Sequence, residues 1–148
     1  MCHDFNSLYP SVIDGYNLSP DTYVENPQGY PYWFNYTPTF GGFSSNPTLD
    51  TARFSLQGKL CTFFILCSAD GISNDIILTM TAPITNGSMR TALLCGQVVD
   101  NGSILTTPPL ALLAASSTTI NCFSTYVGAG WTASNAKRIV ELSGFYSI

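Results

Sequence analysis

The clearest alternation of apolar and polar positions lies between Ala52 and Ala82. Phe54 and Leu56 alternate with polar neighbours, as they would in a half-buried strand. Leu60–Cys67 is a nearly continuous apolar run, and a further apolar segment follows at Ile76–Met80. A helix is the alternative for Leu60–Cys67, but the run is short and glycines bound it on both sides. The pattern therefore predicts three strands in this region.

Turn signals divide the chain into short segments. Gln57-Gly58 and Asp70-Gly71 are turn dipeptides, and they predict that the three strands form an antiparallel meander. Further along, Asp100-Asn101-Gly102 predicts a tight hairpin, whereas Leu110–Ala115 fits either a strand or one helical turn. Other strands are expected at Tyr36–Phe43, Thr91–Val99, Ser103–Thr107, Thr118–Tyr126 and Arg138–Ile148. About eight or nine short strands indicate an all-β fold, a jelly-roll-like antiparallel β-sandwich.

The segment at the C-terminal end has a regular period of two. Val140, Leu142, Tyr146 and Ile148 fall on one face of a strand, and polar residues fall on the other. Gly144 interrupts the apolar face. A glycine inside a strand marks either a β-bulge or a close approach of another group.

The first 35 residues have a different composition from the rest. Frequent prolines and glycines disfavour a long helix or a central strand here, yet aromatic residues are common. We therefore expect an extended N-terminal arm (1–35) that anchors the chain, followed by a β-sandwich domain (36–148). Two interpretations stay open: the rings dock on another surface, or they pack on their own domain. The candidate anchoring residues are Tyr9, Tyr16, Tyr23, Tyr30, Tyr32, Trp33 and Phe34.

The composition narrows the class of protein. Only 9% of the residues are charged, the formal net charge is -4 and 45% of the residues are apolar, whereas soluble domains carry about 25% charged residues. No basic cluster is present, so nucleic acid is not an expected partner. No apolar run is long enough for membrane insertion, and no Sec signal is recognisable at the N-terminus. Such a composition is typical of all-β proteins that contact other chains extensively.

The cysteines predict free thiols rather than a disulfide framework. The chain has five cysteines, an odd number, and none of them form a C-x-x-C pair. Four lie in segments expected to be apolar strands, where free cysteines behave as small buried apolar residues. We therefore expect Cys61, Cys67, Cys95 and Cys122 to be reduced and mostly buried, which suits synthesis in a reducing cytoplasm.

No catalytic, cofactor or metal site is predicted. The single histidine, His3, belongs to Cys2-His3-Asp4, which offers too few ligands for structural zinc and no oriented base for a nucleophile. Carboxylate pairs could in principle hydrolyse glycosides, but most of the candidates lie in turns, where Asp commonly caps the backbone. The candidates are Asp50, Asp70, Asp75, Asp100 and Glu141. We therefore expect a protein that is not an enzyme.

Two aromatic residues in the C-terminal third of the chain are candidate ligand contacts. Tyr126 and Trp131 flank a glycine-rich segment, and exposed aromatic rings in loops can stack on sugars. The alternative for Trp131 is that it covers one end of the sandwich core. The sequence favours neither interpretation.

The order of several short motifs resembles that of structural proteins of tailed-bacteriophage virions. The motifs are Tyr36-Thr37-Pro38-Thr39-Phe40, Asn46-Pro47, Ala52-Arg53-Phe54, Gln57-Gly58-Lys59, Gly71-Ile72-Ser73-Asn74 and the terminal Gly144-Phe145-Tyr146-Ser147-Ile148. The resemblance covers Tyr36 to Ile148 and departs from the pattern at Leu105–Ser117. It implies a jelly-roll module at the virion surface, usually trimeric. Arg53 and Lys59 are pattern residues without a catalytic role, so we expect them to make a salt bridge or a subunit contact, or simply to be solvated.

The sequence thus leaves two classes of function. The first is a virion structural protein, either a capsid decoration or head fibre or a tail-fibre tip, made in the bacterial cytoplasm. Its expected partners are further copies in a homotrimer, other virion proteins bound through the arm, and a glycan of the host surface. The second is a non-catalytic carbohydrate-binding module of a secreted bacterial protein. A homotrimer would favour the first.

Overall fold

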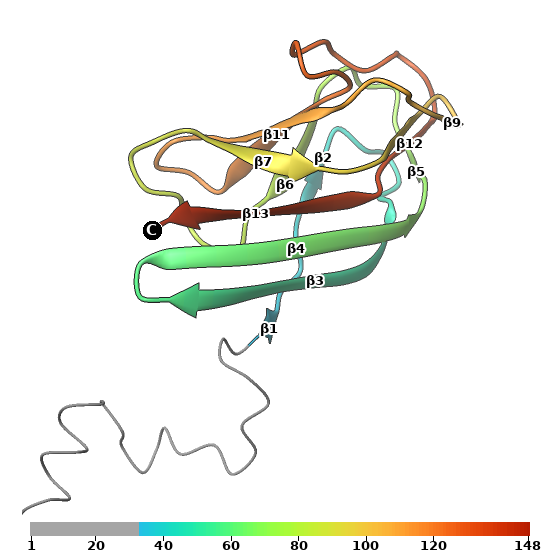
Figure 1. Cartoon of the computed structure of the whole chain (residues 1–148). Coiled ribbons are helices and arrows are strands. Elements are labelled where there is room, and N and C mark those ends of the chain that lie inside the picture. The colour runs from blue at the N-terminus through green and yellow to red at the C-terminus, as the bar shows by residue number, and fades with distance from the viewer. Residues whose placement is uncertain (1–32) are drawn as a thin grey trace, which may run out of the picture. The chain divides into compact units, whose positions relative to one another are not determined.

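The structure is a computed structural model, and it describes residues 33–148. Every regular element in this part of the chain is a β-strand (Figure 1). The strands are β1 (Phe34–Asn35), β2 (Phe40–Gly41), β3 (Thr48–Gln57), β4 (Leu60–Ala69), β5 (Gly71–Ile72), β6 (Leu78–Thr81), β7 (Thr91–Cys95), β8 (Val98–Asp100), β9 (Ser103–Ile104), β10 (Leu110–Leu113), β11 (Thr119–Phe123), β12 (Ala136–Ile139) and β13 (Glu141–Ser147). The sheet begins at Phe34, two residues before the expected boundary at Tyr36.

The strands form two antiparallel sheets. Nine lie in the order β1-β3-β4-β13-β7-β10-β11-β6-β2, and four lie in the order β5-β12-β8-β9. The larger sheet curls into a half-barrel, so its β3-β4-β13 part lies opposite its β10-β11-β6 part (Figure 1). The predicted all-β antiparallel sandwich is confirmed, with one curled sheet supplying both of its main layers. The segment left open in the sequence, Leu110–Ala115, is a strand.

The core lies inside the curl. Alternate residues of β4, namely Cys61, Phe63, Ile65 and Cys67, are at most 1% exposed, as the period of two requires. The ring of Phe63 meets the ring of Tyr146 from β13 edge to face, with centroids 5.9 Å apart. Each large side chain buried in this way contributes about 1.5–3 kcal/mol to folding.

The predicted meander is half right. β3 and β4 form the expected hairpin, and Gly58 occupies its turn with a φ of 59°. The third strand, β6, does not pair with β4; it pairs with β11 and β2. β4 instead pairs along seven residues with β13. The pairing of β4 with β13 extends over seven residues, whereas β6 has only four residues to offer. The longer pairing forms more ladder hydrogen bonds, and the local sequence does not indicate it.

Two segments expected to be single strands each divide between the sheets. Thr91–Val99 splits into β7 and β8, and Arg138–Ile148 splits into β12 and β13. Both breaks occur at one place, where Gly96 N donates to Glu141 O and Val140 N donates to Gln97 O, each at 2.9 Å. Paired strands therefore leave the large sheet together and continue into the small one.

Gly144 marks a close approach rather than a bulge. The pairing of β13 with β4 runs through Gly144 without a register shift. A Cβ atom at Gly144 would lie 2.6 Å from Cδ2 of Leu93 on β7, so a larger residue would have to displace that buried leucine. Glycine here lets β7 and β13 pack closely at the point where the sheet curls.

Candidate functional site

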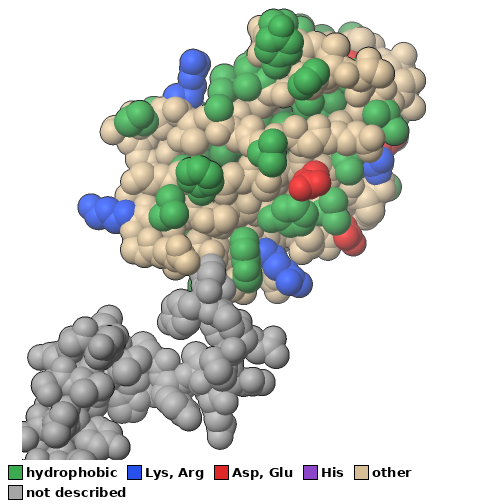
Figure 2. All heavy atoms as spheres, viewed as in Figure 1, with side chains coloured by type: hydrophobic (Ala, Val, Ile, Leu, Met, Phe, Trp, Pro, Cys, Tyr) green, Lys and Arg blue, Asp and Glu red, His purple; other side chains and the backbone are tan. Residues whose placement is uncertain are grey.

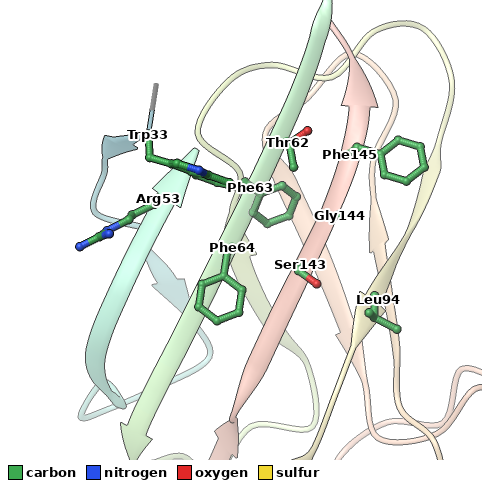
Figure 3. A pocket seen from close by; sticks show the side chains of 9 residues that line it. All are labelled: Trp33, Arg53, Thr62, Phe63, Phe64, Leu94, Ser143, Gly144 and Phe145. Atoms are coloured by element: carbon green, nitrogen blue, oxygen red, sulfur yellow. The ribbon is translucent and has the colours of Figure 1, made fainter. Parts of the chain in front are cut away.

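The outward-facing side of the large sheet carries an open groove of about 530 Å³. Outward residues of four neighbouring strands line up across the sheet: Arg53 of β3 is paired with Phe64 of β4, Phe64 with Ser143 of β13, and Ser143 with Leu94 of β7. In the next row, Thr62 is paired with Phe145. Figure 3 shows these side chains with Trp33, which precedes β1; the full lining is Trp33, Arg53, Thr62, Phe63, Phe64, Leu94, Ser143, Gly144 and Phe145.

The groove is apolar and accessible. Trp33 is 46% exposed, Phe145 68% and Leu94 69%. Figure 2 shows hydrophobic side chains over this part of the molecule with few charged ones between them. Exposed apolar surface of this kind commonly marks a site of contact with another molecule. The Arg53 guanidinium, the Trp33 indole N–H and the hydroxyls of Thr62 and Ser143 add polar side-chain groups to the lining.

Two of the candidate anchoring residues, Trp33 and Phe34, belong to the described domain. Phe34, in the edge strand β1, packs its ring against Phe54 at a centroid distance of 5.5 Å, and Tyr36 meets Phe54 edge to face at 5.9 Å. Trp33 lines the groove. These rings nevertheless keep exposed area, since Phe34 is 48% exposed. The other anchoring candidates, Tyr9, Tyr16, Tyr23, Tyr30 and Tyr32, lie outside the described residues, as does Cys2-His3-Asp4.

Arg53 and Lys59 have separate surroundings. Arg53 belongs to the groove. Lys59 lies in the turn of the β3–β4 hairpin, where its backbone carbonyl accepts a hydrogen bond from Ile148 N at 2.9 Å and its side chain is exposed. Only Arg53 is therefore part of the candidate site.

Tyr126 and Trp131 do not form a common ligand site. Trp131 is 3% exposed, and its Nε1 donates to the carbonyl of Cys122 at 2.8 Å. Trp131 thus packs in the core, the second of its two interpretations. Tyr126 is 67% exposed beside Val127 in the turn that follows β11. The groove, rather than this turn, collects the accessible aromatic rings.

The groove was not predicted from the sequence because the residues that line it come from four separate strands. Leu94, Thr62 and Ser143 have no distinctive local pattern. One signal was present: Phe64 and Leu66 occupy the outward positions of β4, where a half-buried strand would carry polar residues. An apolar outward face on a strand that is otherwise alternating indicates a covered or binding surface.

The described cysteines are inert thiols. Cys61, Cys67 and Cys122 are buried, Cys95 is half-buried, and all four are free, which confirms the prediction for these residues with Cys95 the least buried. Burial raises the pKa of Cys67 to about 11 and that of Cys95 to about 12, and it raises the pKa of Cys122 well above its ordinary value. A thiol with a raised pKa is seldom a thiolate and is therefore a poor nucleophile.

Beside the small sheet lies a buried polar cluster that sequence analysis did not anticipate. Lys137 of β12 is fully buried, and its Nζ donates to the carbonyls of Ser73 at 2.8 Å, Asp75 at 3.1 Å and Ser134. Burial lowers the pKa of Lys137, while the negative charges of Asp100 and Asp75 act in the opposite direction. Three ammonium protons and three carbonyls satisfy one another, so this cation fastens loops to the sheet.

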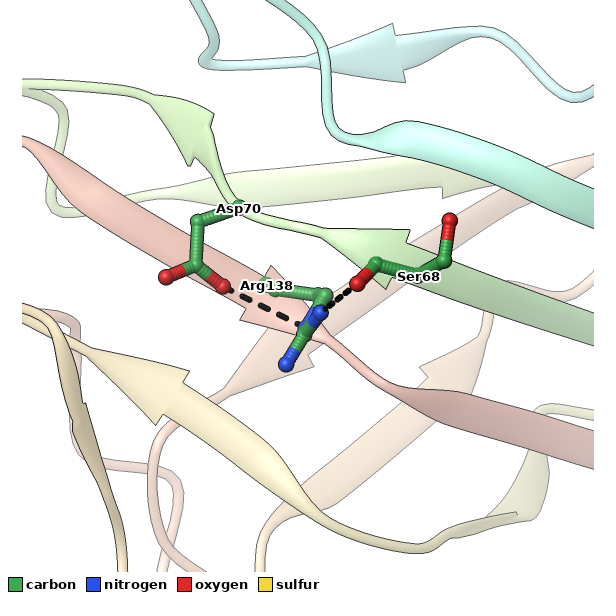
Figure 4. Close-up of polar contacts among 3 residues, drawn as sticks. All are labelled: Ser68, Asp70 and Arg138. Carbon is green, nitrogen blue, oxygen red and sulfur yellow. Dashed lines mark hydrogen bonds and ion pairs between the residues drawn. The ribbon is translucent and has the colours of Figure 1, made fainter.

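Two further carboxylates hold the same region. Asp100 is 6% exposed and accepts hydrogen bonds from Thr132 N at 3.0 Å and Thr132 Oγ1 at 2.8 Å. Arg138 lies with its Nε 3.3 Å from Asp70 Oδ1 and donates through Nη1 to the carbonyl of Ser68 (Figure 4). The Asp100 contacts join the end of β8 to the loop before β12, and the Arg138 contacts join β12 to the end of β4. They are structural contacts of the kind that close a sandwich end.

No group of three or more His, Cys, Asp or Glu residues within 33–148 is placed to hold a metal ion. The described residues also contain no helix of the length and hydropathy needed to cross a bilayer.

Comparisons with known proteins gave no relatives. No family model matches the chain, and neither a curated protein nor a solved structure matches it.

Proposed function

We propose that this chain is a non-enzymatic structural protein of a bacteriophage virion, displayed on the particle as a capsid decoration, a head fibre or a tail-fibre tip. It acts as a homotrimer and helps the particle to attach to its host or to remain stable. The observation that carries this proposal is the exposed aromatic groove on the outward face of a charge-poor sheet. Such a face is costly to leave in water and favours contact with another protein.

The position of the motifs that resemble phage proteins supports the same assignment. Ala52-Arg53-Phe54 lies in β3 and the terminal Gly144–Ile148 motif begins in β13, and both strands border the groove. Arg53, Gly144 and Phe145 belong to these motifs and also line the groove. The residues that carry the resemblance therefore include those that shape the candidate contact surface.

The proposal is tested on particles. Antibodies raised against the full chain should label purified phage particles from the source lysate in immunogold electron microscopy, and the protein should remain in the particle fraction after gradient purification. Labelling at the head would assign a decoration role, and labelling at the tail tip would assign an attachment role. A protein found wholly in the soluble fraction, with unlabelled particles, would contradict a virion role.

A second candidate function is a non-catalytic carbohydrate-binding module. The observation that favours it is the chemistry of the groove, where the exposed rings of Trp33 and Phe145 lie with a guanidinium and two hydroxyls. Aromatic faces stack on sugars, and the polar groups orient them. In this case Trp33→Ala should reduce binding on a glycan array at least tenfold, and Tyr126→Ala, a matched exposed aromatic elsewhere, should not. Equal binding by both variants would exclude the groove as a sugar site.

A further inference from the structure

The outward face of β3, β4 and β13 carries charges of both signs. Arg53 lies on β3 and Glu141 lies on β13, and both side chains are exposed. The strand between them, β4, presents Phe64 and Leu66, which pair with Arg53 and Glu141 respectively. The face is therefore positive at Arg53, apolar along β4 and negative at Glu141.

These two charges do not form an ion pair with each other within one copy. Their strands are separated by β4, which places them roughly 10 Å apart across the sheet at about 4.8 Å per strand, and they occupy different rows along it. Within residues 33–148 the single ion pair joins Arg138 to Asp70. Arg53 and Glu141 thus remain available to groups on another molecule.

We propose that this face is the contact between copies in the homotrimer, with Arg53 of one copy against Glu141 of the next. This inference rests on the proposed trimeric function. When the positive flank of each copy meets the negative flank of its neighbour, the contact is head-to-tail, and such contacts form a ring of three when the rotation between neighbours is about 120°. Phe64 and Leu66 lie toward the middle of the ring, and Leu94 and Phe145 extend the apolar contact area.

The charge balance of the domain favours a second copy as the occupant. All five Lys and Arg residues of the chain lie within 33–148, and so do five of its nine Asp and Glu residues. The formal net charge of this region is therefore zero, so these regions of two copies do not repel one another strongly. Neighbouring copies offer a group of opposite sign to each flank, whereas a partner of one sign would match only one flank.

Charge reversal in the full chain tests the pairing. Arg53→Glu and Glu141→Arg should each raise the concentration at which the trimer dissociates by at least tenfold, because like charges then meet at every contact. The double variant R53E/E141R should restore the trimer, since the charges again alternate. Lys59→Glu, the same change of charge away from the groove, should leave assembly unchanged. Light scattering after size exclusion measures the mass against the 16.0 kDa monomer.

Each outcome bears on a different claim. A monomeric wild-type chain would contradict the proposed homotrimer itself. A wild-type trimer unaffected by either reversal and by Phe145→Ser would overturn this interface alone and leave the face for another partner, such as a different virion protein or residues 1–32. Weakening by both single reversals without recovery in the double variant would overturn the Arg53–Glu141 pairing.

Two controls accompany the reversals. Circular dichroism of each variant shows whether a variant that fails to assemble is still folded. Phe145→Ser, at a 68% exposed position, tests the face without altering charge.

Discussion

The interior of the nine-stranded sheet and the interior beside the four-stranded sheet are built from different side chains. The first is closed by apolar groups and thiols, among them Phe63, Cys67 and Leu142. The second contains, beside the apolar side chains of Val98 and Ile139, a buried ammonium and a buried carboxylate, those of Lys137 and Asp100. Both interiors are buried, but the loss of a side chain has a different consequence in each.

The difference shows where this fold obtains stability and where it obtains specificity. Apolar contacts in the curl are numerous and non-directional, so removing one side chain costs in proportion to the cavity left behind. The ammonium of Lys137 has three fixed acceptors, so it dictates where the 73–75 loop and Ser134 lie. Losing that cation would leave the Ser73 carbonyl unpaired in a buried site and the other two carbonyls without their partner, and a buried unpaired group costs about 1–3 kcal/mol.

The largest expected effect is in the apolar interior. Phe63→Ala should reduce the free energy of unfolding by about 3–5 kcal/mol, because it removes a fully buried ring and leaves a cavity beside Tyr146. Urea titration followed by circular dichroism measures the loss. Tyr126→Ala, an exposed aromatic truncation, should change stability by less than about 0.5 kcal/mol. Equal losses in the two variants would mean that the curl does not enclose the main core.

The next effect tests the polar interior. Lys137→Met keeps a side chain of similar length but removes the ammonium, and we expect a loss of about 3 kcal/mol from unpaired carbonyls. The matched control is Lys59→Met, which should be within about 0.5 kcal/mol of wild type because Lys59 is exposed. If Lys137→Met is as stable as its control, the cation does not hold the small sheet and the contrast between the two interiors fails.

A smaller effect is expected at the junction of the two sheets. Gly71 opens β5, and a Cβ atom there would lie 2.7 Å from Pro47 N and from Ser45 O. These are backbone atoms that cannot swing aside, so Gly71→Ala should cost about 1–3 kcal/mol. Gly58→Asn is the control, since asparagine tolerates the positive φ of that turn and nothing lies within 4 Å. Thermal melts compare the two, and a neutral Gly71→Ala would show that the junction can relax.

The smallest effect concerns pH, to which the two interiors respond with opposite signs. Burial raises the folded-state pKa of Cys67 to about 11 from an ordinary value of 9.0. Between these values the unfolded chain has lost a proton that the folded chain keeps, so stability falls as pH rises. The lowered pKa of Lys137 acts the other way: below 10.5 the unfolded chain binds more protons, and stability rises with pH.

Urea midpoints between pH 8 and pH 11 separate these contributions. Cys67→Ala should flatten the alkaline decline by at most about 1.4 kcal/mol per pH unit, the value for one proton. Lys137→Met should instead steepen the decline, because the opposing group is gone. Thr62→Val, which changes no titratable group, should leave the slope unaltered. Identical slopes in all four proteins would show that neither buried group keeps its shifted pKa.

Local sequence determined the elements and several of their turns. The period of two in Leu60–Cys67 gave the long strand β4 and its buried face, since alternate side chains of a strand must point to opposite sides. Asn101 and Gly102 both adopt positive φ and form the predicted hairpin between β8 and β9, because these residue types accept that conformation at little cost. Such features depend on neighbouring residues alone.

Pairing partners and the candidate site were decided only by the tertiary structure. β4 pairs with β13 rather than with β6, and β7 and β13 leave the large sheet at one shared point, because ladders between distant segments compete on total length and burial. The groove is assembled from Arg53, Phe64, Leu94 and Phe145, which approach one another only after that choice. The alternation along β12 likewise places Lys137 on the inward face. Two of the carbonyls that accept hydrogen bonds from its ammonium, however, belong to a loop more than 60 residues away in the chain, so the sequence around Lys137 does not reveal them.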